Sequence, residues 1–167
     1  MKKLKTFLIL LLITNFGFAQ KSDNKIRSEI AGTWTLISVE NNNSDGTKTL
    51  PYGSNPKGIL FFDAKGNYSI QIYKNERQKI ASGDKNKCSA EENVSIVQGS
   101  NSHFGTYEID EINKILTFNI QTASFPNWEN TGQKRSYILN NNQIKYVVTN
   151  TTQGGNKVTA EVVWEKL

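Results

Sequence analysis

The segment QKRSYILNNNQIKYVVTN, residues 133–150, has the clearest structural pattern in this chain. Apolar and polar side chains alternate through two runs, 133–140 and 143–150, and Asn141-Asn142 joins them. A two-residue connection between two alternating runs is typical of a tight β-hairpin. Similar short runs rich in Val, Ile, Thr, Tyr and Phe recur along the chain, separated by Asn, Gly, Asp and Lys. Helical periodicity is nearly absent, so the sequence predicts an all-β fold.

Eight runs of this kind predict eight strands. They are residues 33–40, 58–63, 67–74, 104–110, 114–121, 133–140, 143–150 and 157–167. The connections after the second, fourth and sixth runs are short, whereas residues 41–57, 75–103 and 122–132 form long ones. Consecutive connections of an up-and-down meander fall on opposite ends, so the hairpins should share one end and the long loops the other. We therefore predict an eight-stranded antiparallel up-and-down β-barrel, with room inside for side chains or one small ligand.

The long connection 75–103, between the third and fourth strands, contains one helix signal. The residues SAEE, 89–92, form a capping-box pattern, and Gly99 is suited to end the short helix that they begin. An additional short strand over residues 93–98 is the alternative. We expect the apolar side chains of the helix to rest on the barrel mouth; they are Val94, Ile96 and Val97.

The first twenty residues read MKKLKTFLILLLITNFGFAQ. Lysines precede an apolar run, and small residues follow it up to Ala19, as in a secretory signal peptide. We therefore predict a signal peptide over residues 1–19, a linker over 20–28 and one lipid-free barrel domain over 29–167. The protein is expected to be exported to the periplasm or secreted, with no membrane span in its mature part; an uncleaved membrane anchor is the alternative.

Charge and composition argue against several classes of function. The formal net charge is +5, but part of it comes from the predicted signal peptide, and no basic stripe remains for binding nucleic acid. Cys88 is the only cysteine and His103 the only histidine, so the sequence predicts neither an internal disulfide nor a metal site. We expect a neutral surface or hydrogen-bonding role for His103. No nucleophile-elbow, P-loop or dinucleotide motif occurs, and we expect no cofactor.

Several segments carry a resemblance to a known family. They are Gly32-Thr33-Trp34, DGTKTLPYGSNPKGIL (45–60), FGTYE (104–108), SFPNWENTGQKRSY (124–137) and WEKL (164–167). In this order they resemble the bacterial lipocalin-like domain family, within the calycin group of barrels, over residues 29–167. The resemblance implies an antiparallel barrel with a central cavity, but no single activity. It also implies that Trp34 plugs the barrel floor beneath a basic side chain, for which we expect Lys166 rather than Arg135.

Arg135 shares one strand face with Gln133, Tyr137 and Leu139, because successive strand residues point to opposite sides. We expect this face to point inward, since Tyr137 and Leu139 are largely apolar. An inward guanidinium needs a partner, because a buried unpaired charge is very costly. That partner is either a protein carboxylate, with Glu108 as the candidate, or the acidic group of a ligand, which arginine holds with two hydrogen bonds.

Aromatic residues in the long loops complete the candidate site. Phe125 and Trp128, in the loop 122–132, and Tyr52, in the loop 41–57, are interpreted either as rim contacts for a ligand or as a satellite core. The predicted ligand-binding residues are Arg135, Gln133, Tyr137, Trp128, Phe125, Tyr107 and Tyr52.

These residues predict a monomeric protein that binds a small apolar or amphipathic molecule, which carries an acidic group if it is the partner of Arg135. No catalytic residue is assigned. One alternative is an isomerase or cyclase that shapes an apolar substrate in the cavity, with Tyr107, Tyr137 and Arg135 as its polar groups. The other is an envelope interaction module whose barrel is filled by its own side chains.

Overall fold

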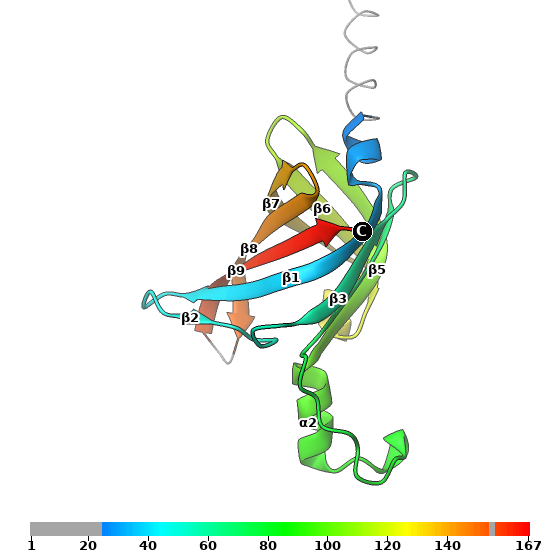
Figure 1. The fold of residues 1–167 in the computed structure, drawn as a ribbon, viewed down its shortest axis with the longest axis vertical. Helices are drawn as coiled ribbons and strands as arrows, with labels where there is room; N and C mark the ends of the chain where they lie inside the picture. The colour runs from blue at the N-terminus through cyan, green and yellow to red at the C-terminus, as the bar shows by residue number, and fades with distance from the viewer. Residues whose placement is uncertain (1–24, 154–155) are drawn as a thin grey trace, which may run out of the picture.

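The computed structural model describes residues 25–153 and 156–167 (Figure 1). The predicted signal peptide, residues 1–19, lies outside the described residues. Of the predicted linker, residues 20–28, the part from residue 25 onward belongs to a helix that extends to residue 30.

Eight long strands form the closed antiparallel β-barrel that the sequence predicts. Each strand pairs with the next along the chain, and pairing between the first and the last closes the barrel. A short strand, β2 (Lys48–Thr49), is added beside the end of β1. The eight barrel strands are β1 (Gly32–Asn43), β3 (Lys57–Phe62), β4 (Asn67–Tyr73), β5 (Ser100–Asp110), β6 (Ile115–Ala123), β7 (Thr131–Asn140), β8 (Gln143–Gln153) and β9 (Asn156–Lys166).

The two ends of the barrel differ as predicted. The short connections β3–β4, β5–β6 and β7–β8 lie together at the upper end in Figure 1, beside the C-terminus and the helix at residues 25–30. The long connections lie at the lower end, which we call the loop end; the upper end is called the tight end. The hairpin between β7 and β8 has the expected register, with Asn140 opposite Gln143 and Tyr137 opposite Tyr146.

The tight end is closed by Trp34 and the helix at residues 25–30. Trp34 is fully buried, and its Nε1–H donates a hydrogen bond of 2.9 Å to the carbonyl of Ile30. Lys166 Nζ lies 5.3 Å from the centre of the Trp34 ring and donates a hydrogen bond of 2.7 Å to the carbonyl of Glu29. Lys166 is therefore the basic partner of Trp34, as we expected.

The predicted helix is present as α2 (Ala90–Gln98), and its capping box is confirmed. Ser89 Oγ accepts a hydrogen bond from the Glu92 amide, the Glu92 side chain accepts one from the Ser89 amide, and Gly99 ends the helix. The alternative, a strand over residues 93–98, is wrong.

The position expected for α2 is also wrong, because the helix covers no part of the mouth. β5 begins at Ser100, directly after the terminal Gly99, so the chain has no length in which to fold the helix back over the barrel. Figure 1 shows α2 projecting beyond the loop end. The three apolar side chains expected to rest on the mouth are therefore exposed; they are Val94, Ile96 and Val97.

One hydrophobic core runs through the barrel and includes Ile26 and Ile30 of the helix at the tight end. Alternating residues of every barrel strand contribute to it, as the period of two in a β-strand requires. Within residues 25–153 and 156–167, no helix has the length and hydropathy needed to cross a bilayer. The largest fully buried side chains are Trp34, Trp164, Tyr107, Tyr146, Phe62 and Phe118.

Candidate functional site

The inward face of β7 is the one that the sequence predicts. Arg135 and Tyr137 are buried, Gln133 and Leu139 are half-buried, and the residues between them are exposed. Arg135 keeps only 6% of its surface exposed, and it is the single charged side chain among the buried residues that the structure describes. The alternation of β7 therefore places a guanidinium inside the barrel.

Two aromatic rings and one amide hold this guanidinium. Arg135 Nη2 donates a hydrogen bond of 2.8 Å to Gln133 Oε1. The central guanidinium carbon lies 4.5 Å from the ring centre of Phe118 and 4.8 Å from that of Tyr146, which is the geometry of a cation–π contact. The two ring centres are only 5.8 Å apart. Both rings therefore contact the guanidinium and lie against each other.

No carboxylate among the described residues pairs with Arg135. None of the salt bridges found there includes Arg135, and its Nε atom has no hydrogen-bond partner. The internal partner that we considered, Glu108, is wrong, because β5 alternation turns this side chain outward, where it accepts a hydrogen bond of 3.1 Å from Asn119 Nδ2.

This arrangement leaves the charge of Arg135 only partly compensated. A buried cation loses its hydration, and the loss is offset only by a counter-charge or by a full set of hydrogen bonds. Cation–π contacts with Phe118 and Tyr146 stabilise the desolvated cation by about 1–2 kcal/mol each. The positive charge of Arg135 also acts on its surroundings: burial raises the pKa of Tyr146, and the guanidinium opposes that rise.

His103 and Tyr68 form a second polar pair in the interior. The Tyr68 hydroxyl and His103 Nδ1 are 2.8 Å apart, and both residues are buried. Burial lowers the pKa of His103, and together with the smaller effect of the nearby Arg135 charge brings it to about 3. His103 is therefore neutral at physiological pH and takes the hydrogen-bonding role that we expected. Burial raises the pKa of Tyr68, so its hydroxyl stays protonated.

Sequence reasoning did not identify these neighbours of Arg135 as site residues. The strand predicted at 104–110 begins in fact at Ser100, and His103 shares the inward phase of Tyr107. Both phases of residues 67–74 are apolar enough to face inward, so the orientation of Tyr68 was not decided by the pattern. The four neighbours that were missed are Tyr68, His103, Phe118 and Tyr146.

A continuous series of ring contacts leads from the tight end to the loop end past this site. Neighbouring ring centres in the series are between 4.6 and 6.0 Å apart, mostly in edge-to-face geometry. We call this series the aromatic ladder; in order, it consists of Tyr107, Phe62, Phe118, Tyr68, His103, Trp128 and Phe125.

The predicted rim residues lie at the loop end, but to different depths. Trp128 is half-buried in the short helix η2 (Pro126–Trp128) and contacts the His103 ring. Phe125 packs against Trp128 and keeps 45% of its surface exposed. Tyr52 packs on the core, and burial raises the pKa of its hydroxyl. These contacts show that the loops 41–57 and 122–132 both reach the interior.

Tyr107 and Tyr137, in contrast, belong to the tight end. The Tyr107 hydroxyl donates a hydrogen bond of 2.7 Å to the carbonyl of Asp63 in the β3–β4 turn. The Tyr137 amide donates one of 2.9 Å to the carbonyl of Lys114 in the β5–β6 turn. Of the predicted site residues, the structure therefore brings Gln133 into contact with Arg135 and places these two tyrosines nearer the floor.

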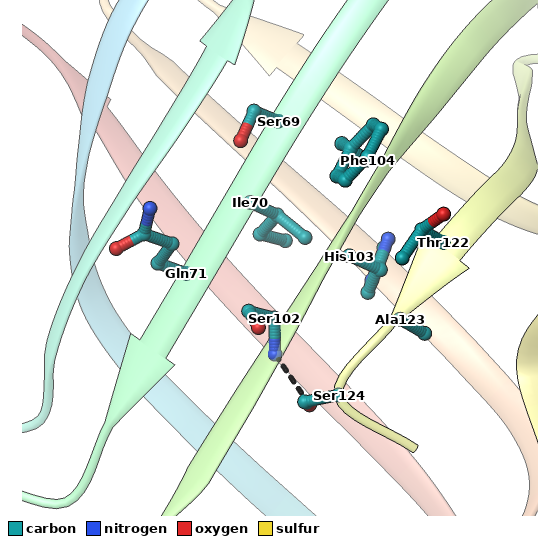
Figure 2. Close-up of a pocket in the computed structure, with 9 residues that line it drawn as sticks. All are labelled: Ser69, Ile70, Gln71, Ser102, His103, Phe104, Thr122, Ala123 and Ser124. Atoms are coloured by element: carbon teal, nitrogen blue, oxygen red, sulfur yellow. Dashed lines mark hydrogen bonds between the residues drawn. The ribbon is translucent and has the colours of Figure 1, made fainter. Parts of the chain in front are cut away.

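The outer wall of the barrel carries a shallow groove of about 320 Å³ across β4, β5 and β6 (Figure 2). Its floor is the row of backbone formed by Ile70, His103 and Ala123, which are opposite one another in the sheet. Outward side chains flank this row on both sides; they are Ser69, Phe104 and Thr122, and Gln71, Ser102 and Ser124. No charged side chain lines the groove, and Arg135 lies on the other side of the wall, so the two features are separate.

A metal site has no support in the part of the chain that the structure describes. No group of three or more His, Cys, Asp or Glu side chains is found there in a metal-binding arrangement. Cys88 is a half-buried free thiol that donates a hydrogen bond of 3.2 Å to the carbonyl of Lys85.

The protein is a closed eight-stranded antiparallel barrel, with one end plugged and long loops at the other. Barrels of this kind generally bind small molecules inside. The family model of the lipocalin-like domain matches residues 31–167, and the chain belongs to this family. No curated protein sequence matches the chain.

Proposed function

We propose that this protein binds a small, largely apolar molecule in the barrel interior and that the acidic group of this molecule pairs with Arg135. The observation that carries the proposal is the buried guanidinium, which has no carboxylate partner among the described residues and whose Nε atom is unpaired. An acidic ligand supplies the counter-charge that the described residues do not.

The contacts of Arg135 support a role in recognition. Gln133 accepts a hydrogen bond from Nη2, and Phe118 and Tyr146 pack against the guanidinium, so it has a defined orientation before a ligand arrives. The unpaired Nε–H is the donor that we assign to the carboxylate of the ligand, for which the planar fork of arginine is well matched. Preorganisation of this kind lowers the entropic cost of binding.

The loop end supplies the apolar part of the proposed site. Trp128 and Tyr52 come from different loops, and both pack on the edge of the core. Their rings present apolar surface together with one polar atom each, which suits the rim of a pocket. We infer that a ligand enters between these loops, with its acidic group leading.

Export is the second part of the proposal. The sequence at residues 1–19 has the order of charge, apolar run and small residues that a signal peptidase recognises. Intact mass measured after expression with and without a secretion system tests this directly. Loss of residues 1–19 upon export is expected, and an exported chain of full length would contradict the proposal.

Native mass spectrometry of the purified protein, followed by titration with small organic acids, tests the binding function. The decisive variant is Arg135→Gln, and Lys134→Gln is the matched control, because Lys134 is the adjacent residue on the outward face of β7. We expect Arg135→Gln to weaken binding of acidic ligands by about tenfold or more, as the loss of a hydrogen bond to a charged group requires. Equal affinity of the two variants for every acid that binds would overturn the proposal.

A further inference from the structure

The charges around the candidate site also restrict how many negative charges the ligand carries. Among the buried residues that the structure describes, Arg135 is the only charged side chain, and the other polar ones are Asn41 and His103. His103 is a neutral imidazole hydrogen-bonded to the Tyr68 hydroxyl, so it adds no second positive charge.

A single buried cation balances a single negative charge. A carboxylate on Arg135 leaves the interior neutral, whereas a phosphate dianion leaves one negative charge without a partner in a poorly solvated space. An alcohol of the same shape leaves the guanidinium uncompensated. The count of charges therefore favours a monocarboxylate over both a dianion and a neutral ligand.

The walls around the guanidinium restrict the rest of the ligand. Phe118 and Tyr146 contact Arg135 directly, and Phe118 is also a member of the aromatic ladder, 4.6 Å from the Tyr68 ring. A flat aromatic ring placed beside these side chains makes edge-to-face or offset contacts, which contribute beyond the burial of apolar area. A flexible aliphatic chain of similar area makes no such contacts and loses more conformational entropy when it is bound.

We propose that the interior site is selective for a planar aromatic monocarboxylate, whose carboxylate pairs with Arg135 and whose ring extends the aromatic ladder toward Trp128. This inference rests on the proposed function, because it assigns the class of ligand to the same site. It adds two kinds of selectivity that an acid-binding barrel need not have: for ligands with one negative charge, and for ligands with an aromatic ring.

Isothermal titration calorimetry of the purified exported protein with four probes separates these properties. The probes are 2-naphthoate, 2-naphthyl phosphate, 2-naphthalenemethanol and decanoate, and pH 8 keeps the phosphate doubly ionised. We expect 2-naphthoate to bind about tenfold or more tightly than each of the other three probes. Arg135→Gln should abolish this preference over the alcohol, whereas Lys134→Gln should preserve it.

The aromatic part has its own variants. Phe118→Leu should reduce the preference for 2-naphthoate over decanoate severalfold, since it removes a ring from the ladder. Because Phe118 is fully buried, Trp128→Leu at the rim is the second variant, and it should act in the same direction with a smaller effect.

The outcomes distinguish this inference from the proposed function. If decanoate or the phosphate binds as tightly as 2-naphthoate and depends on Arg135, the selectivity is wrong and the acid-binding function stands. If the alcohol binds as tightly as the acid, or if Arg135→Gln leaves binding of every acid unchanged, both proposals are overturned.

Discussion

Two basic side chains lie above aromatic rings inside this barrel, one at each half, and their surroundings differ. At the tight end, Lys166 lies over Trp34, donates a hydrogen bond to the carbonyl of Glu29 and is only half-buried. Toward the loop end, Arg135 is almost completely buried, contacts two rings and donates a hydrogen bond to the neutral side chain of Gln133.

The same kind of contact therefore serves two purposes in this barrel. Lys166 is half-buried and has a carbonyl partner, so its contact with Trp34 closes the floor at little cost in desolvation. Arg135 has lost its hydration without gaining a counter-charge from the residues that the structure describes, and stability alone does not account for such a position. We therefore interpret the tight end as structural and the surroundings of Arg135 as the site of recognition.

Truncation of the floor should have the largest effect. Trp34→Ala removes a fully buried ring, opens a cavity and leaves the Ile30 carbonyl without its partner. We expect the free energy of unfolding to fall by about 3–5 kcal/mol, measured by urea denaturation. Trp128→Ala is the control, because Trp128 is only half-buried at the rim. An equal loss of stability in both variants would contradict the assignment of a structural role to the floor alone.

Protonation of His103 should lower the free energy of unfolding at acidic pH. The folded pKa of about 3 lies below the ordinary value of 6.5, so the unfolded chain takes up a proton first as the pH falls. Stability from this group is therefore complete above pH 6.5 and is lost progressively toward pH 3, by about 1.4 kcal/mol per pH unit, or about 3 kcal/mol at pH 4. Urea denaturation across this range should show a shallower slope for His103→Gln than for the wild type; identical slopes would contradict the buried, neutral imidazole.

Removal of the guanidinium should stabilise the ligand-free protein. Arg135→Met replaces a buried, partly compensated charge by an apolar chain, and we expect the free energy of unfolding to rise by about 1–2 kcal/mol. Protein refolded from denaturant, which releases bound molecules, is the appropriate sample for urea denaturation. Lys134→Met, on the outward face, should change little. A clear loss of stability in Arg135→Met would show that the guanidinium is structural, like Lys166.

The corresponding substitution at the tight end, Lys166→Met, should lower the free energy of unfolding, and by a smaller amount. Lys166→Met removes the hydrogen bond to the Glu29 carbonyl and the contact with Trp34. We expect a loss of about 1 kcal/mol in the free energy of unfolding, and thermal melts are a convenient check. Lys157→Met, at an exposed position of β9, is the control. If Lys166→Met is as stable as this control, Lys166 has no structural role and the contrast with Arg135 is wrong.

Much of the fold was determined by the sequence alone, because its signals are local. The alternation around Asn141-Asn142 predicts the β7–β8 hairpin and the inward face that carries Arg135, and the structure confirms both. The capping box at residues 89–92 and the terminal Gly99 predict the bounds of α2. Each signal spans a few residues whose backbone preferences and side-chain period do not depend on the rest of the chain.

The surroundings of these elements depend on tertiary contacts. Phe118, Tyr146 and His103 meet near Arg135 because β5, β6, β7 and β8 are neighbours in the sheet and their combined registers bring these inward side chains together. The exposed position of α2 depends likewise on where β5 begins. Local alternation predicted one positive charge inside the barrel; the register of β7 with its two neighbouring strands determined that aromatic rings, and no carboxylate among the described residues, lie beside it.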